Sequence, residues 1–156
     1  MPPIVCLHLL NPLPEAGDSP RPRDFARALA AAGAEAGEVN LVLTTAEELQ
    51  RLNRTFRRRD RSTDVLAFDY RETASEGALW GDVYVSAEAV LEQARERGIP
   101  PREELARLFL HGCLHLLGHR DHAAQERKRM LAVQEALLPG ILAAHPKPPS
   151  RGPRRR

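Results

Sequence analysis

The amino-acid sequence predicts an α+β fold, in which a small mixed sheet of four strands packs against about five helices. Two kinds of segment carry this prediction. Short runs of β-branched and apolar residues occur in irregular order among longer runs that have apolar residues at helical spacing. Strict alternation of strand and helix fails, because a loop joins the third and fourth expected strands. A chain of 156 residues is one domain by length, and we expect that domain to cover residues 1–143.

The first part of the chain contains two expected strands, each followed by a helix. The apolar run over residues 4–10 predicts the first strand, and a proline-rich loop follows it. Asp24 is placed to cap a helix that stops at Gly33. Residues 39–44 predict the second strand, and the capping-box pattern of residues 45–48 opens the second helix.

The middle of the chain supplies the other two strands. Residues 64–68 and 81–85 predict the third and fourth strands. Ser86 is expected to cap a helix that stops at Gly98. The Pro100-Pro101 pair then opens the next helix, because proline is tolerated in a first turn where its missing N–H costs nothing.

The end of the chain combines a last helix with a basic tail. The helix is expected over residues 123–138, and Pro139-Gly140 closes the packed region. Residues 144–156 are rich in proline, lysine and arginine, so we expect them to be disordered. No run approaches the roughly 20 apolar residues that a membrane span needs. Two cysteines, Cys6 and Cys113, are too few for a disulfide framework, and a cytoplasmic protein is expected.

Four of the six histidines lie between residues 111 and 122. His111 and His115 are four residues apart, so on a helix they project from one face. Gly118 then ends the helix, and the loop beyond it can bring His119 or His122 to the same point. Two imidazoles from one helical turn and a third from the following loop form an open zinc site, in which bound zinc lowers the pKa of a water to about 7.

The residue after the first of these histidines is Gly112. In zinc peptidases of the H-E-x-x-H type, this position holds the glutamate that acts as general base. The metal-binding pattern is therefore kept while the peptidase base is missing, which disfavours peptide hydrolysis. Cys113 is expected to be a small buried residue and not a metal ligand.

Arginine dominates the segment between residues 51 and 61, which has one acid, Asp60. The six arginines are Arg51, Arg54, Arg57, Arg58, Arg59 and Arg61. Guanidinium groups present planar pairs of N–H donors that fit phosphate oxygens, so such a cluster beside zinc suits cleavage of a phosphodiester. A solvated helix end is an equally good interpretation of the cluster, since cations are favourable near a helix C-terminus.

Four segments carry a wider pattern: Leu52-Asn53 with Phe56-Arg57, residues 62–68, residues 81–86, and the histidine segment. In this order and spacing they resemble the YbeY family of zinc-dependent single-strand endoribonucleases. The resemblance implies one α+β domain, a single catalytic zinc on three histidines, and Arg57 as an arginine beside the metal. It also implies a role in 16S rRNA 3′-end maturation and ribosome quality control, with single-stranded rRNA, the ribosome and small-subunit assembly proteins as partners.

The histidine segment departs at one point from the family pattern H-G-x-L-H-L-x-G-x-D-H. In that pattern the third histidine follows the first by ten residues, whereas one inserted residue here puts His122 eleven residues after His111. The zinc ligands are predicted to be His111, His115 and His122. His122 is preferred because it keeps the terminal Asp-His pair, and His119 is the alternative third ligand.

Two other functions stay open from the sequence. The chain is, in one alternative, a zinc hydrolase of another substrate such as a peptide. In the other it is an RNA-binding ribosome assembly factor whose zinc is mainly structural. Chelation separates the last alternative from an enzyme, because removing a structural metal unfolds the chain, while a catalytic metal in an open site can leave a folded protein behind.

Overall fold

The computed structural model of the chain describes residues 2–11, 20–57, 63–71 and 78–142. Four strands and five helices lie in these segments, and the predicted α+β fold is confirmed. Their bounds, in chain order, are β1 Ile4–Leu9, α1 Pro22–Ala31, β2 Ala36–Thr44, α2 Ala46–Arg57, β3 Val65–Asp69, β4 Ala78–Ser86, α3 Ala87–Arg97, α4 Pro101–Leu116 and α5 Ala124–Leu142.

The sheet is mixed and has the strand order β1-β2-β4-β3. The first three strands in this order run parallel, and β3 pairs with β4 in the antiparallel sense. β3 is therefore an edge strand, with the backbone groups of alternate residues directed away from the sheet.

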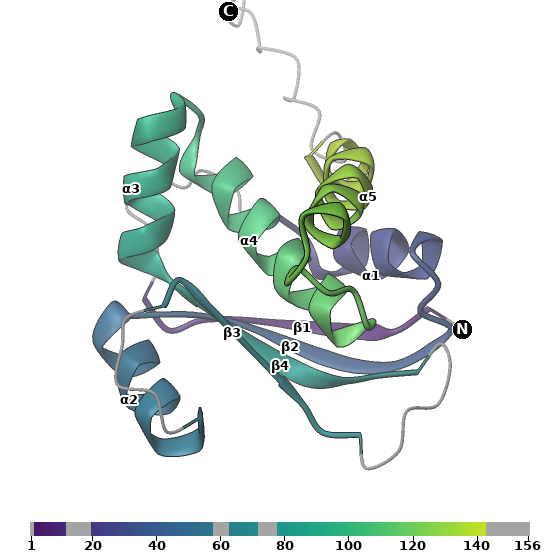
Figure 1. Cartoon of the computed structure of the whole chain (residues 1–156), viewed down its shortest axis with the longest axis horizontal. Coiled ribbons are helices and arrows are strands. Elements are labelled where there is room, and N and C mark those ends of the chain that lie inside the picture. The colour runs from purple at the N-terminus through teal and green to yellow at the C-terminus, as the bar shows by residue number, and fades with distance from the viewer. Residues whose placement is uncertain (1, 12–19, 58–62, 72–77, 143–156) are drawn as a thin grey trace, which may run out of the picture.

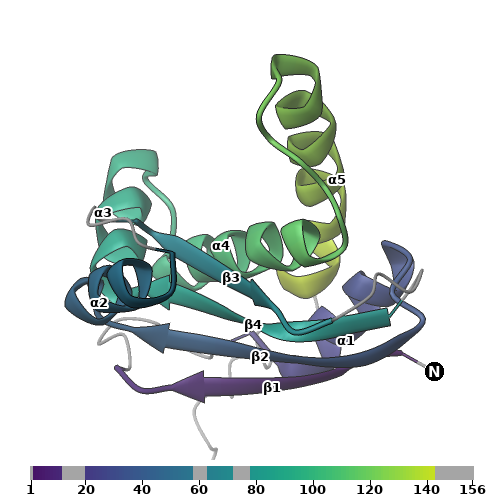
Figure 2. The ribbon, with the colours of Figure 1, turned by 60° about the horizontal axis from the view of Figure 1, so that its bottom comes forward.

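The helices are divided unequally between the two faces of the sheet. Figure 1 shows α1, α3, α4 and α5 on one side, where they enclose the main core, and α2 on the other side. α4 is central to that core, since Phe109, Leu110 and Leu114 are fully buried. α2 forms a smaller cluster in which Leu49 and Leu52 pack against β3. Figure 2 shows α5 rising away from the sheet beside the end of α4.

Local sequence signals set several of the element boundaries. The Thr45 hydroxyl accepts a hydrogen bond from the backbone N–H of Glu48 at 3.1 Å, as the capping-box pattern predicts. Ser86 caps α3 in the same way, through the N–H of Ala89. Gly98 ends α3 with φ +66°, a left-handed conformation that glycine adopts without strain. The predicted caps at Ser86 and Gly98 are confirmed.

Two helix boundaries differ from the prediction. α1 begins at Pro22, so Asp24 lies in its first turn and is not the cap; the fixed φ of proline suits the first helical position. α5 does not end before Pro139 but continues to Leu142. The additional turn buries Ile141 completely, and this packing offsets the hydrogen bond that proline cannot donate. The first prediction was wrong because proline sets the start of α1, and the second was wrong because the packing of Ile141 extends α5 past Pro139.

Some predicted features lie outside the described residues. These are the end of the domain at residue 143, the basic tail of residues 144–156, and the arginines at positions 58, 59 and 61. Among the helices that the structure does describe, none is both long enough and apolar enough to cross a membrane.

Candidate metal centre

Two histidines of α4 face each other one helical turn apart. The Nε2 atoms of His111 and His115 are 3.2 Å apart, and the two rings are nearly perpendicular, at 86°. α4 holds both rings firmly, because its neighbouring residues Leu110, Cys113 and Leu114 are fully buried. The prediction that Cys113 is a core residue is consistent with this burial, which raises the pKa of its thiol to about 12.

The outer nitrogens of both rings have acceptors. His111 Nδ1 lies 2.9 Å from Oε1 of Gln134, and His115 Nδ1 lies 3.0 Å from the backbone oxygen of His119. A hydrogen bond that Gln134 Nε2 donates to Oε1 of Glu135 fixes the orientation of the Gln134 amide. Carbonyl oxygens only accept, so each Nδ1 carries the proton and each Nε2 keeps a lone pair. Two lone pairs that face each other at 3.2 Å repel, and a cation between them removes that repulsion.

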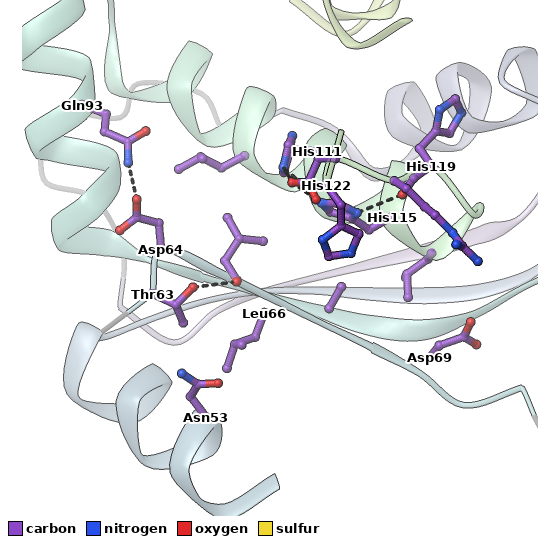
Figure 3. Close-up of a pocket in the computed structure, with 16 residues that line it drawn as sticks. Asn53, Thr63, Asp64, Leu66, Asp69, Gln93, His111, His115, His119 and His122 are labelled. Atoms are coloured by element: carbon purple, nitrogen blue, oxygen red, sulfur yellow. Dashed lines mark hydrogen bonds and ion pairs between the residues drawn. The ribbon is translucent and has the colours of Figure 1, made fainter. Parts of the chain in front are cut away.

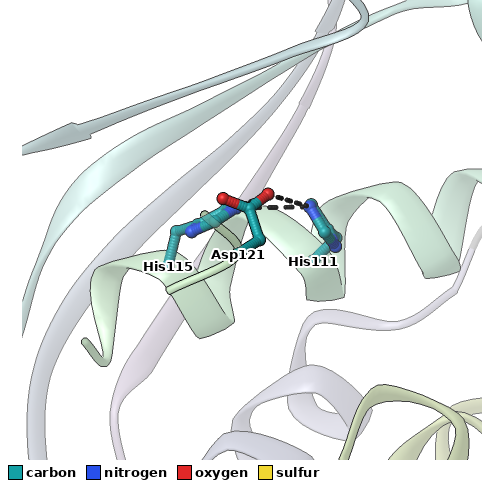
Figure 4. A group of neighbouring side chains, drawn as sticks. All are labelled: His111, His115 and Asp121. Atoms are coloured by element: carbon teal, nitrogen blue, oxygen red, sulfur yellow. Dashed lines mark hydrogen bonds and ion pairs between the residues drawn. The ribbon is translucent and has the colours of Figure 1, made fainter. Parts of the chain in front are cut away.

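Asp121 supplies a third ligand atom at the same point. Its Oδ2 lies 3.4 Å from Nε2 of His115 and 3.9 Å from Nε2 of His111. Figure 4 shows the carboxylate directed at both rings, and one ligand atom from each residue lies within 4.8 Å of the others. Ligands about 2.1 Å from a tetrahedral zinc are about 3.4 Å from one another. The group therefore fits a divalent cation in size and in donor type.

His119 and His122 are not members of this group among the described residues. His119 takes part through its backbone oxygen, and Figure 3 shows its ring turned away from His111 and His115. His122 is exposed. Arg127 of α5 fixes this part of the loop, because its Nη1 donates to the backbone oxygens of Asp121 and His122.

The three ligand atoms lie at the wall of an open cleft of about 720 Å³ between β3, α4 and the loop after α4. Figure 3 shows Thr63, Asp64 and Gln93 at one end of this cleft and the histidines at the other. Asn53 of α2 also lines it, and β3 contributes Val65 and the residues that follow. The site is thus accessible to a polymeric substrate along one edge of the sheet.

Comparison with known proteins assigns the chain to a family. The model of the family described as endoribonuclease YbeY matches residues 23–141. The chain belongs to this family. It is 42% identical over 110 residues to endoribonuclease YbeY of Anaeromyxobacter dehalogenans, a match that covers 70% of this chain and 56% of that protein. The corresponding protein of Thiobacillus denitrificans is 36% identical over 131 residues, 84% of this chain and 88% of that protein.

Two further comparisons bear on length and fold. The match to endoribonuclease YbeY of Myxococcus xanthus has 40% identity and covers 65% of this chain but 35% of that protein. The chain thus spans only about half or less of the length of these two relatives. The solution structure of TM1509 from Thermotoga maritima is similar in fold, with a TM-score of 0.59 and 25% identity over 97% of this chain and 99% of that one.

The structure brings Asp121, which was not among the ligands predicted from the sequence, to the two histidines. In the YbeY pattern the third ligand follows the first by ten residues, and in this chain that position holds Asp121, because Arg120 is inserted before the terminal Asp-His pair. Residue type favoured His122, whereas residue spacing favoured Asp121. The ligand role of His122 stays a prediction.

Burial keeps His111 in the form that binds metal. Its partial burial lowers the pKa below the usual value for histidine, and the hydrogen bond to Gln134 opposes this shift to a smaller extent. His111 is therefore neutral at pH 7, and its Nε2 lone pair is available to a cation.

Replacing Gln134 by leucine is expected to weaken metal binding about 10- to 100-fold. Gln134 is 3% exposed, and its loss leaves the Nδ1–H of His111 without an acceptor and its ring free to rotate. Gln134→Glu keeps an acceptor at the same place and should retain wild-type affinity or better. Competition with a chromophoric chelator measures both constants, and equal affinity for the leucine and glutamate variants would contradict this role of Gln134.

The packing around Gly112 explains why this YbeY chain has no glutamate directly after His111. A Cβ at this position would lie 2.4 Å from Cγ1 of Val83 and 3.2 Å from Cγ1 of Val65, so it would point into the sheet and not toward the metal. A larger side chain is excluded by packing, and the peptidase base has no place here.

Gly112→Ala is therefore expected to destabilise the fold by about 1–3 kcal/mol, although alanine favours a helix over glycine by about 1 kcal/mol. Denaturant unfolding measures the change in the free energy of unfolding. In a double-variant cycle, Gly112→Ala should cost less in the Val83→Ala background than in the wild type, because Val83→Ala removes both methyl groups that the new Cβ meets. A more stable single variant would show that α4 can move away from the sheet.

Proposed function

We propose that this chain is a metal-dependent endoribonuclease that cleaves single-stranded RNA. The observation that carries the proposal is the pair of Nε2 lone pairs facing each other at 3.2 Å, beside the carboxylate of Asp121, in an open cleft of a YbeY-family chain. We further propose that the metal is zinc, one ion per chain. Nitrogen ligands with one carboxylate suit zinc, although they do not select it alone.

The residues of the cleft divide the work as follows. His111, His115 and Asp121 hold the ion, and His122 is the alternative third ligand. A bound divalent cation supplies a Lewis acid that stabilises charge on phosphoryl oxygens. Gln134 and the backbone oxygen of His119 fix the protons on the outer nitrogens, so that the inner nitrogens face the ion.

Arg57 is proposed to bind the scissile phosphate. Arg57 is the last residue of α2, the helix whose Asn53 lines the cleft. A guanidinium bound to that phosphate compensates the charge that builds up on the phosphate oxygens during cleavage.

The cellular substrate is proposed from family membership alone. On this basis the chain acts in the cytoplasm, on the 3′ end of 16S rRNA and in ribosome quality control, together with the ribosome and proteins of small-subunit assembly. The relatives of this chain are named as endoribonucleases, which supports RNA as the substrate class.

A mainly structural zinc is not favoured by the packing of α4. The metal ligands lie at the surface of a helix whose opposite side is already buried in the main core, through Phe109, Leu110 and Leu114. Packing against the main core therefore stabilises α4 without metal, and a chelator is expected to leave the secondary structure unchanged.

Arg57→Ala is expected to lower kcat/KM for a single-stranded RNA oligonucleotide about 100- to 1,000-fold, because one charge-stabilising donor is lost. The assay uses purified chain with zinc, and metal content is measured on the same samples. Arg51→Ala is the matched control, since Arg51 is an exposed arginine of the same helix that pairs with Glu48. Wild-type cleavage by Arg57→Ala would remove Arg57 from the mechanism, and wild-type protein that binds zinc without cleaving RNA would contradict the proposed activity.

A further inference from the structure

The aromatic residues of this chain are unevenly distributed. The chain has seven, four phenylalanines, two tyrosines and one tryptophan, and two of them, Phe25 and Phe109, are in the main core. The other five lie on the sheet face opposite α4, or on α2 beside that face; they are Phe56, Phe68, Tyr70, Trp80 and Tyr84. Phe56, Tyr70 and Trp80 are 66%, 61% and 50% exposed. Exposed aromatic side chains that gather on one face of a protein are typical of a binding site.

These rings form a strip along the edge of the sheet. Phe68 and Tyr70 are two residues apart, so their side chains share one face. The N–H of Tyr70 donates to the backbone oxygen of Trp80 at 3.0 Å, which places these two residues side by side. At the other end, the ring centroid of Phe56 is 5.9 Å from that of Phe68. The strip therefore runs from the end of α2 to the start of β4.

The same edge strand separates this aromatic strip from the metal centre. Along β3, Val65, Ala67 and Asp69 line the cleft, while Phe68 and the following Tyr70 belong to the strip on the other face. A chain molecule that crosses the open edge of β3 can contact both. Figure 1 shows that α2 is the helix on the strip side of the sheet, so most of that face is free of helices in the described part of the chain.

Hydrogen bonds hold the centre of the strip in place. The Tyr70 hydroxyl donates to Oδ2 of Asp82 at 2.7 Å, and Asn40 Nδ2 donates to Oδ1 of the same carboxylate at 3.0 Å. This contact raises the pKa of Tyr70 to about 12, so the phenol stays protonated. An exposed ring that is already ordered loses little rotamer freedom when it binds a ligand.

Charge is divided along the strip in a way that suits one ligand. The Arg51 guanidinium pairs with Glu48, and the remainder of α2 beyond Arg51 has no acid and carries Arg54 and Arg57 on either side of Phe56 in the sequence. The middle of the sheet face carries the carboxylates Glu38 and Asp82, which repel phosphate. This arrangement suits a ligand that carries both negative charges and flat neutral groups, with its phosphates toward α2 and its bases stacked on the aromatic rings. Single-stranded nucleic acid has this chemistry, and every base offers a face for stacking.

We propose that the aromatic strip is a second binding site for single-stranded RNA, separate from the metal centre, on which bases stack against Phe56, Tyr70 and Trp80. The site deepens the proposed function and rests on it, because it holds the substrate strand beside the cleft in which cleavage takes place. Stacking is independent of sequence, so the site favours single strands over duplexes without selecting particular bases.

The test uses the single tryptophan of the chain, Trp80, as its reporter. A 12-nucleotide oligoadenylate is titrated into the full chain with His115→Ala, so that binding is measured without cleavage. The oligonucleotide should quench Trp80 fluorescence, and a duplex of the same length should not. Tyr70→Leu keeps an apolar side chain but removes the ring, and it should weaken binding about 10- to 100-fold. Tyr70→Phe keeps the ring and loses only its hydrogen bond to Asp82, so it should bind much more tightly than Tyr70→Leu and only slightly more weakly than the parent.

The matched control is Leu131→Ala, which removes an exposed apolar side chain of α5 outside the strip and should leave affinity unchanged. Equal affinity of Tyr70→Leu and its parent, or equal quenching by the duplex, would overturn the proposal. So would a shift of Trp80 emission with protein concentration in the absence of RNA, which would make the face a contact between copies of the chain. Failure of the wild type to cleave RNA is a separate outcome, because binding to the strip is read in a variant that needs no activity.

Discussion

His115→Ala is expected to lose its zinc and to cleave RNA at least about 1,000-fold more slowly than the wild type, while it remains folded. The variant removes one of two nitrogens that face each other at 3.2 Å, so a single imidazole and a carboxylate are left. The loss of Lewis-acid stabilisation is worth several kcal/mol, and each 1.4 kcal/mol is about a factor of ten in rate. Elemental analysis and an RNA oligonucleotide assay measure the two effects.

The controls for this prediction come from the same segment. His119→Ala removes a ring that is turned away from the site and keeps the backbone oxygen that accepts from His115, so it should retain metal and activity. Circular dichroism verifies that both variants are folded, as the burial of the other side of α4 leads us to expect. A folded His115→Ala chain with full zinc content would place the metal elsewhere.

Asp121→Ala is expected to lose zinc as well, whereas His122→Ala should keep it. Asp121 Oδ2 lies 3.4 Å and 3.9 Å from the two histidine nitrogens, and Asp121 occupies the spacing at which the family has its third ligand. His122 is exposed and outside the group. Loss of a ligand should lower the affinity by at least about 100-fold, more than the loss of a partner that only orients a ligand.

The cobalt form distinguishes the two ligand sets without an activity assay. Its visible absorption depends on coordination, so Asp121→Asn should change the spectrum and His122→Ala should not. The reverse result, with zinc and the cobalt spectrum lost in His122→Ala alone, would restore the three-histidine site predicted from residue type. In that case the loop rearranges when metal binds, and the contacts of Arg127 with the loop carbonyls are broken.

Local chemistry was enough to predict most of the fold. Residue patterns of strand and helix, together with the caps at Thr45, Ser86 and Gly98, located four strands and five helices. They did not locate the start of α1 or the end of α5, which depend on proline geometry and on the burial of Ile141. Burial against another element is not encoded in the segment that is buried, and it becomes visible only in three dimensions.

The metal centre likewise combines a feature that local sequence predicts with features that depend on the tertiary fold. The four-residue spacing of His111 and His115 fixed their common helix face from sequence alone. The proposed third ligand depends on how the connection of residues 117–123 folds back, and the insertion of Arg120 makes residue type and residue spacing favour different residues. Gln134 could not be anticipated, because it reaches His111 from a different helix across 23 positions of sequence.

The division of the proposed metal ligands between helix and loop has a kinetic consequence. Two of the proposed ligands belong to α4, which is packed into the core, and the third belongs to a loop that Arg127 holds by two hydrogen bonds. Metal exchange therefore does not require α4 to unfold; it requires only that the loop opens. The residence time of the ion should follow the strength of the Arg127 contacts, and its equilibrium selectivity should follow the identity of the three ligands. Exchange rate and metal preference are thereby controlled by different residues.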